Sequence, residues 1–282
     1  MTVKHTFQHC LLLLASLCIA FAPSTWLRGQ ARQNPPAANI PRLPNGRPDF
    51  QGLWLKSNGG FQGLFIGSLD GTNFAGGGGR GGRGRGAGPA PSRYEYTPEA
   101  EAERQDRLQR GYEDPEARCH LPGVPRSLDQ PAGLYPVQII QDEKYVALLH
   151  EAMHDVRIIP TDNSRHPKNY WAWDGDSRGR WDGDTFVVDV SNFNGRTWLD
   201  MQGNFVDANE HVVERFTLVD PDTIVYEATI SDPTVFVKPV EMRFMLKRVP
   251  ADQQILEYSC LEGERSLQHY TEEDGGRKLR VK

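Results

Sequence analysis

The chain has 282 residues, a formal net charge of −5 at pH 7, and 24% charged residues in which both signs are mixed. That balance disfavours nucleic acid and anionic membrane surfaces as main partners. After a leader and a Gly-rich insert are set aside, roughly 200 residues remain from Pro48 onward, enough for one domain with a full core.

The N-terminus has the order of a secretory signal. Lys4 precedes an apolar stretch over residues 10–22 that ends in small residues. Because this stretch is shorter than the roughly 20 residues that a spanning helix needs, we expect a cleaved signal peptide over 1–22 and no membrane span. The protein is then secreted or periplasmic, with a loose Pro-rich leader over 23–45 and a single domain over 46–282.

Residues 71–92 form a Gly/Arg-rich insert, whose composition predicts an extended loop. The alternative, an RNA-binding segment, does not suit an exported acidic protein. The one clear helix follows the insert: Thr97 is a candidate N-cap, Pro98 suits the first turn, and Gly111 is a stop signal. This helix has few apolar residues, so we expect it on the surface.

From residue 136 onward, short alternating segments separated by turn residues indicate antiparallel strands. Asp182-Gly183 predicts a tight hairpin, and Asp220-Pro221-Asp222 predicts a second. The expected strands are 52–56, 137–141, 145–151, 156–160, 178–181, 184–190, 211–219, 223–231, 240–249 and 254–260. Strands in this meander order predict an all-β fold that closes, or nearly closes, into an antiparallel β-barrel.

Gly52-Leu53-Trp54 is similar to the G-x-W opening strand of lipocalin-like barrels, in which the tryptophan plugs one end. This resemblance implies an interior pocket of a size that holds one small ligand.

Two of the four cysteines lie within the signal, so the mature chain keeps Cys119 and Cys260. In an oxidising compartment two remaining thiols are most simply a disulfide. The alternative is a nucleophilic thiol, but neither cysteine lies in a recognisable active-site sequence.

Longer motifs carry a second resemblance. The pattern W-x-G-D-S-x-G-x-W-D-G-D-T at 173–185, together with segments 48–54, 193–200 and 214–216, is similar to an uncharacterised family of exported soil-bacterial proteins. The similarity covers nearly the whole mature chain apart from the insert. It implies export and a common fold, and it implies no reaction and no catalytic residue.

The segment 171–200 contains four tryptophans and six aspartates. Indole rings beside carboxylates suit a site that stacks on a ligand ring and hydrogen-bonds its polar rim. The expected ligand-binding residues are Trp171, Trp173, Asp176, Trp181, Asp184, Trp198 and, on a neighbouring strand, Arg157. For Asp174 and Asp182 the better interpretation is turn chemistry. A partial calcium-loop pattern begins at Asp174 and fails at Arg178 and Thr185.

The candidate catalytic residues are His154, Asp200, His211 and Glu214. Carboxylates with a histidine suit acid/base work on a sugar or another polyol, by hydrolysis or elimination and without a cofactor. In the alternative interpretation Glu214 is an ordinary strand residue and Trp198 fills the core. The chief rival function is a binding protein that uses the same pocket for a small molecule without turnover.

The sequence His150-Glu151-Ala152-Met153-His154 matches HExxH, in which two histidines one helical turn apart bind zinc. This interpretation predicts a helix over 142–156 and a zinc hydrolase, although no third ligand stands at the expected position of Pro160. In the competing strand interpretation, both histidines face the barrel interior as packing or acid/base residues.

Overall fold

The computed structural model describes residues 39–57, 94–130, 134–260 and 262. The expected signal peptide, most of the leader and the Gly-rich insert lie outside these residues. The elements are β1 (Gly52–Lys56), α1 (Pro98–Gln109), η1 (Gly111–Glu113), η2 (Glu116–Arg118), β2 (Val137–Gln141), β3 (Tyr145–His150), η3 (Ala152–His154), β4 (Val156–Pro160), β5 (Asp176–Asp182), β6 (Thr185–Ser191), β7 (His211–Asp220), β8 (Thr223–Ser231) and β9 (Val240–Arg248).

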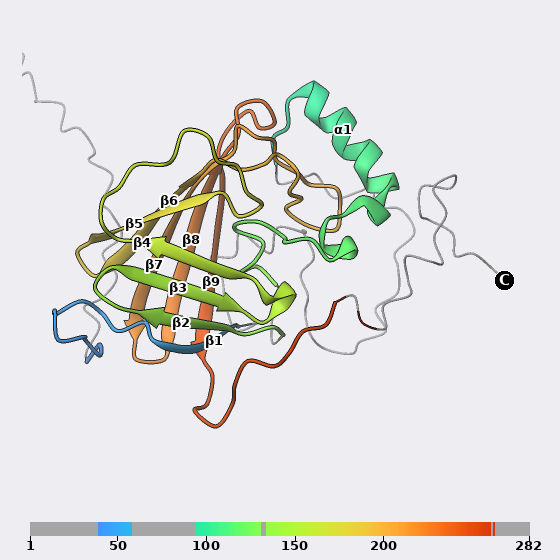
Figure 1. Cartoon of the computed structure of the whole chain (residues 1–282). Helices are drawn as coiled ribbons and strands as arrows, with labels where there is room; N and C mark the ends of the chain where they lie inside the picture. The colour runs from blue at the N-terminus through green and yellow to red at the C-terminus, as the bar shows by residue number, and fades with distance from the viewer. Residues whose placement is uncertain (1–38, 58–93, 131–133, 261, 263–282) are drawn as a thin grey trace, which may run out of the picture. The chain divides into compact units, whose positions relative to one another are not determined.

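The nine strands form one sheet in the order β4-β3-β2-β1-β9-β8-β7-β6-β5, and each neighbouring pair is antiparallel. Figure 1 shows β2, β3 and β4 lying across β7, β8 and β9, so that the sheet curves into a nearly closed barrel. The sequence-based prediction of an all-β antiparallel barrel is therefore confirmed.

An odd number of antiparallel strands leaves the two end strands, β4 and β5, running in the same direction. Among the described strands, these two are not joined by a backbone ladder, and side chains hold the seam instead. Nε of Arg157 on β4 donates to Oγ of Ser177 on β5 at 2.8 Å. Further along, a Cβ at Gly179 would lie 2.6 Å from Phe186 and 3.0 Å from Ile159 of β4, so only glycine permits this close approach.

The core fills the barrel interior because strand alternation points every second side chain inward. On β7 the inward residues are Val212, Glu214, Phe216 and Leu218, of which three are apolar and buried. Trp54 of β1 is completely buried, its Nε1 donates to the Phe50 carbonyl at 2.8 Å, and the Arg248 guanidinium lies 4.2 Å from its ring centre.

Helix α1 begins as predicted. The Thr97 hydroxyl accepts from the Ala100 backbone N–H, Pro98 opens the first turn, and Ala100 is the one buried residue of the helix. Figure 1 shows α1 outside the sheet, as expected for its polar composition. In the part of the chain that the structure describes, no helix combines the length and apolar character that a membrane crossing requires.

Two predictions about the strands are wrong. Residues 254–260 form no strand: Leu256 N donates to the Glu151 carboxylate, and Tyr258 N donates to Nε2 of His154, each at 2.8 Å. The side chains of Glu151 and His154 thus bind backbone N–H groups that a neighbouring strand would otherwise pair with. The first hairpin turn is Gly183-Asp184, one residue later than expected, because Asp182 still pairs with Thr185.

The expected disulfide is confirmed, with 5.8 Å between the Cα atoms of Cys119 and Cys260. It joins the turn after η2 to the segment that follows β9, 141 residues away.

Candidate functional site

A charged network spans the barrel interior. Nη1 of Arg157 donates to Oε1 of Glu214 at 3.0 Å, and its Nη2 contacts Oε2 of the same carboxylate. Tyr226 of β8 donates its hydroxyl to Oε1 at 2.9 Å. With the Arg157 bond to Ser177, this network links β4, β5, β7 and β8, and its four members are buried. Because a buried charge must be paired, Arg157 and Glu214 neutralise each other here.

Two further carboxyl groups, Asp155 and Asp174, lie beside this network and close to each other. Burial, followed by the negative charge of Asp155, raises the pKa of Asp174 well above its usual range. Asp174 therefore keeps its proton to a higher pH than a free aspartate does.

His150, the last residue of β3, points inward and is 5% exposed. Its backbone N–H donates to the Asp155 carbonyl at 2.8 Å, and the charge of the Asp155 side chain acts on the imidazole. Burial lowers the pKa of His150, so the ring is neutral at pH 7.

The ring of His150 hydrogen-bonds the backbone of Ser127, an interaction that favours the protonated ring. Nε2 of the ring is buried and has no hydrogen-bond partner among the described residues. In a neutral imidazole one nitrogen carries the proton and the other is an acceptor. The Ser127 hydroxyl, 4% exposed as a residue, likewise has no partner in the described part of the chain.

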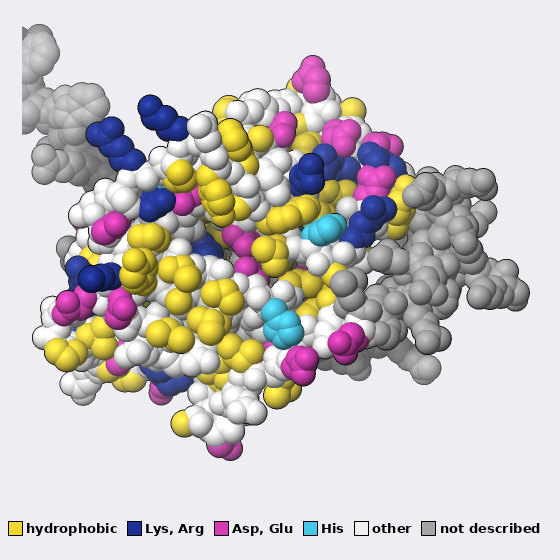
Figure 2. Space-filling model, viewed as in Figure 1, with side chains coloured by type: hydrophobic (Ala, Val, Ile, Leu, Met, Phe, Trp, Pro, Cys, Tyr) yellow, Lys and Arg dark blue, Asp and Glu magenta, His cyan; other side chains and the backbone are white. Residues whose placement is uncertain are grey.

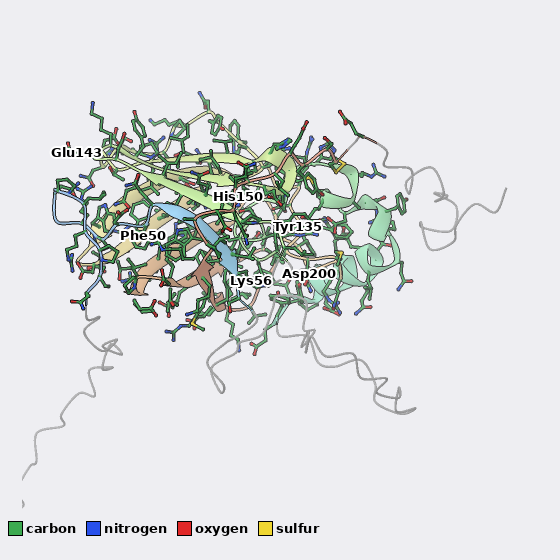
Figure 3. The ribbon with its side chains drawn as sticks, turned by 90° about the horizontal axis from the view of Figure 1, so that it is seen from below. Phe50, Lys56, Tyr135, Glu143, His150 and Asp200 are labelled. Atoms are coloured by element: carbon green, nitrogen blue, oxygen red, sulfur yellow. A yellow bond between two sulfur atoms is a disulfide. The ribbon has the colours of Figure 1, made fainter. Side chains whose placement is uncertain are left out.

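Figure 2 shows a hollow in the face of the molecule that carries β3 and β4, and both acidic and basic side chains are visible at its bottom. Asp155 and Arg157 are the inward charged residues at this part of β4. Figure 3 shows His150 in the middle of the molecule, away from Glu143 at the β2–β3 hairpin. His150 therefore lies at the end of β3 that is farther from the β2–β3 hairpin.

The residues His150, Asp155 and Asp174, with Ser127, are called the acid/base cluster below. It offers a neutral imidazole nitrogen that can accept a proton and a carboxylic acid that can donate one. Pairs of titratable groups whose environments push their pKa values apart are the pattern of acid/base sites.

Of the residues predicted from the sequence, the structure brings Arg157 and Glu214 into this interior, together with His150, which the strand interpretation placed there. Asp200 lies elsewhere: its carboxylate accepts from Nδ2 of Asn204 at 2.6 Å and from the backbone N–H of Gln202. Burial raises the pKa of Asp200 to about 6. In Figure 3 Asp200 lies on the side of the molecule where α1 is found.

His211 and Asp176 lie on the outer face of the barrel. Nε2 of His211 is 3.0 Å from Asp189, whose other oxygen is 2.8 Å from Nε2 of His166. Nδ1 of His166 is 2.6 Å from Asp176. These four residues fasten the loop before β5 to the sheet rather than lining the interior.

The four tryptophans of the segment 171–200 occupy separate places. Trp171 is 61% exposed, and Trp173 stacks on His120 with 5.1 Å between ring centres. Trp181 packs between Phe50 and Phe186, and Trp198 is buried beneath the Arg107 guanidinium. Asp184, at the hairpin turn, pairs with Arg42 at 2.6 Å. The structure therefore does not gather the predicted ligand-binding residues around one pocket.

His154 lies on the surface, where its Nε2 accepts from Tyr258 N. The strand ends at His150, and Met153, at a φ of 60°, reverses the chain through η3. The helix over 142–156 that a HExxH zinc site needs is not formed, and His150 and His154 do not share a face. In the described ranges no three His, Cys, Asp or Glu side chains are arranged to hold a metal ion.

Reasoning from the sequence missed Asp155, Asp174, Ser177 and Tyr226. Alternation held the signal for Tyr226, which occupies an inward position of β8. Ser177 is an inward residue of β5, but it lies just before the strand expected at 178–181. Asp174 was interpreted as a turn residue because it precedes glycine, yet it is buried against Asp155 from another part of the chain. No local pattern encodes that contact.

Comparison with models of protein families, with curated proteins and with solved structures finds no match for this chain.

Proposed function

We propose that the barrel is a small-molecule enzyme, a lyase or hydrolase that acts by acid/base chemistry on a carbohydrate-like or other polar compound. The observation that carries this proposal is the buried and unpartnered Nε2 of His150, together with Asp174, whose pKa is raised by burial and by Asp155. Buried polar atoms without a partner carry a large free-energy penalty, and folded proteins seldom keep them without a function.

In this proposal His150 is the general base and Asp174 the general acid, and Asp155 holds the proton of Asp174 in place. The Arg157–Glu214 pair is buried and hydrogen-bonded, and its charges act on Asp174 without the pair reacting itself. A base and an acid in one site can remove a proton from one atom of a substrate and protonate a leaving oxygen on another. Elimination and hydrolysis both use a base and an acid in this way.

We also propose that the protein is exported to the periplasm or the medium. The Cys119–Cys260 disulfide supports this location, because disulfides persist in oxidising compartments.

The test is a screen of the mature protein, residues 23–282, against sugars, sugar acids and polyols, with products followed by proton NMR. The wild-type protein is compared with Asp174→Asn, which keeps the shape of the acid but cannot donate its proton. Glu210→Gln is the matched control, since Glu210 is also a buried carboxyl but contacts Thr197 instead of the cluster. We expect product from the wild type and the control only.

The pH dependence adds a second criterion. Turnover needs a neutral His150 and a protonated Asp174, so the rate should fall on both sides of a bell-shaped profile. If a compound binds and no product forms with any protein, the barrel is a ligand-binding protein. If Asp174→Asn turns over as fast as the wild type, the assignment of the acid is overturned.

A further inference from the structure

The outward face of β2, β3 and β4 is apolar. Strand alternation points eight described side chains of these strands away from the core. They are Gln138 and Ile140 on β2, Tyr145, Ala147 and Leu149 on β3, and Val156, Ile158 and Pro160 on β4. Seven of these eight side chains are hydrophobic and none is charged, whereas the solvated face of an antiparallel sheet is normally polar. This surface is called the apolar face below.

The strand register joins these side chains into one patch. Ala147 pairs with Ile140 of β2 on one side and with Ile158 of β4 on the other. Ile158 is 59% exposed and Ile140 is 46% exposed. Figure 2 shows hydrophobic side chains gathered over β3 and β4. Because opposite residues of an antiparallel pair have Cβ atoms about 4.5–5.5 Å apart, the apolar face is continuous across the three strands.

Strands β5, β7, β8 and β9 carry charges at their outward positions. These charged residues are Arg178 and Arg180 on β5, Arg215 on β7, Glu227 on β8, and Glu241, Arg243 and Lys247 on β9. A charged surface can be buried at low cost only where each charge finds a partner. The apolar face does not carry this cost, so burial of this part of the barrel wall by another protein surface is favourable.

The size of the apolar face fits the core of a protein–protein interface. Strands lie about 4.8 Å apart and rise about 3.4 Å per residue, so three strands of this length cover roughly 300 Å². A standard interface takes about 800 Å² from each partner and has a charge-depleted core inside a polar rim. Exposed polar residues border the apolar face and can form that rim: residues 142–144 in the β2–β3 hairpin, residues 162–164 after β4, and His154 in η3.

We propose that the apolar face packs against the apolar face of a second copy of this chain, which gives a two-fold dimer. In a two-fold interface the same patch of both copies is in contact, so the patch must complement itself. A hydrophobic sheet face does so, because two such faces pack about 10 Å apart with interdigitating side chains, and no like charges meet. An unlike partner needs an equally apolar surface, and a second copy necessarily has one. The contact does not use the acid/base cluster, so the dimer is tested independently of the proposed function.

The oligomeric state of the protein tests this pairing. The mature protein, residues 23–282, is measured by sedimentation equilibrium from about 1 μM to about 500 μM, a range that includes the micromolar dissociation constants of weak interfaces. We expect a monomer–dimer equilibrium with no larger species, because a two-fold contact closes on itself.

Ile158→Lys should raise the dissociation constant of the dimer at least about tenfold. The substitution occurs twice in a two-fold interface and places a charge of the same sign in each apolar face. Ile140→Lys, two strands away, should have the same effect and serves as the second variant if the first does not fold. Val237→Lys is the matched control, since Val237 is 66% exposed but lies in the loop before β9, outside the apolar face. Far-UV circular dichroism shows whether each variant is folded.

A wild-type protein that stays monomeric over the whole range would overturn the proposal. So would a dimer that both lysine variants of the apolar face leave as strong as the wild type, because the contact would then use another surface. Growth beyond the dimer would also overturn it, since a two-fold contact cannot extend. A dimer that is weakened by Ile158→Lys or Ile140→Lys, and not by Val237→Lys, would support the proposal.

Discussion

Arg157 and Ser177 close the barrel where its backbone does not. The 2.8 Å hydrogen bond between them joins β4 to β5, the two strands that end the sheet order. Parallel neighbours at this seam follow from the odd number of strands. The same arginine pairs with Glu214 on β7, so one side chain contributes both to closure and to the buried ion pair.

Removal of the seam bond should lower stability. Ser177→Ala leaves the buried Nε of Arg157 without an acceptor, and such a group costs about 1–3 kcal/mol of unfolding free energy. Urea unfolding followed by tryptophan fluorescence measures the loss. Ser191→Ala, at the end of β6, is the control and should change stability by less than about 0.5 kcal/mol. An equal loss in both variants would argue against a specific role for the seam.

Breaking the buried ion pair should have a larger effect than breaking the seam. Glu214→Gln leaves the Arg157 charge unpaired in the interior, for which we expect a loss of about 3–5 kcal/mol. The double variant Arg157→Met with Glu214→Leu removes both charges and should recover most of that loss. Tyr226→Phe, which removes one donor to Glu214, should cost only about 1 kcal/mol. A double variant less stable than Glu214→Gln would contradict this account.

Much of the fold followed from local patterns, because alternation and turn residues act over a few positions. Thr97 and Pro98 fixed the start of α1, and alternation placed the strands of the barrel to within a residue or two at most ends. Errors arose where a longer contact decided the outcome. The segment 254–260 alternates like a strand, but Glu151 and His154 bind its backbone first.

The site was less predictable than the fold for the same reason. Aspartate before glycine is a turn signal, and Asp174 does stand before a glycine with a φ of +62°. Its burial against Asp155 depends on the packing of the loop before β5 onto β4, which no nearby residue encodes. The segment rich in tryptophan and aspartate contains Asp174, but most of the side chains predicted from it face outward or fill the core.

The disulfide should be a large part of the stability. Cys119 and Cys260 are 141 residues apart, and a loop of that length predicts about 5 kcal/mol of stabilisation through the unfolded state. Cys119→Ala with Cys260→Ala should therefore unfold at a clearly lower urea concentration than the oxidised wild type. The reduced wild-type protein is the control and should unfold together with the double variant. A variant as stable as the oxidised protein would show that the bond only tethers the C-terminal segment.

Glu210 should make the protein less stable as pH rises. Burial, followed by the negative charge of Asp232, raises the pKa of Glu210 well above 4.5 in the folded state. The folded chain therefore holds this proton more tightly than the unfolded chain does. The contribution of Glu210 to the free energy of unfolding is fully present below the pKa that Glu210 has in the unfolded chain. This contribution is lost as pH rises toward the pKa that Glu210 has in the folded protein.

Glu210→Gln keeps a neutral side chain at every pH, so it should reduce the dependence of the free energy of unfolding on pH. We expect the variant to match the wild type near pH 4 and to exceed it at pH 8 by about 1 kcal/mol or more, because each unit of pKa shift corresponds to about 1.4 kcal/mol. Urea unfolding across this pH range measures the difference. Glu241→Gln, exposed on β9, is the control and should track the wild type. If the difference in stability between Glu210→Gln and the wild type is the same at pH 4 and at pH 8, Glu210 is not held protonated by its surroundings.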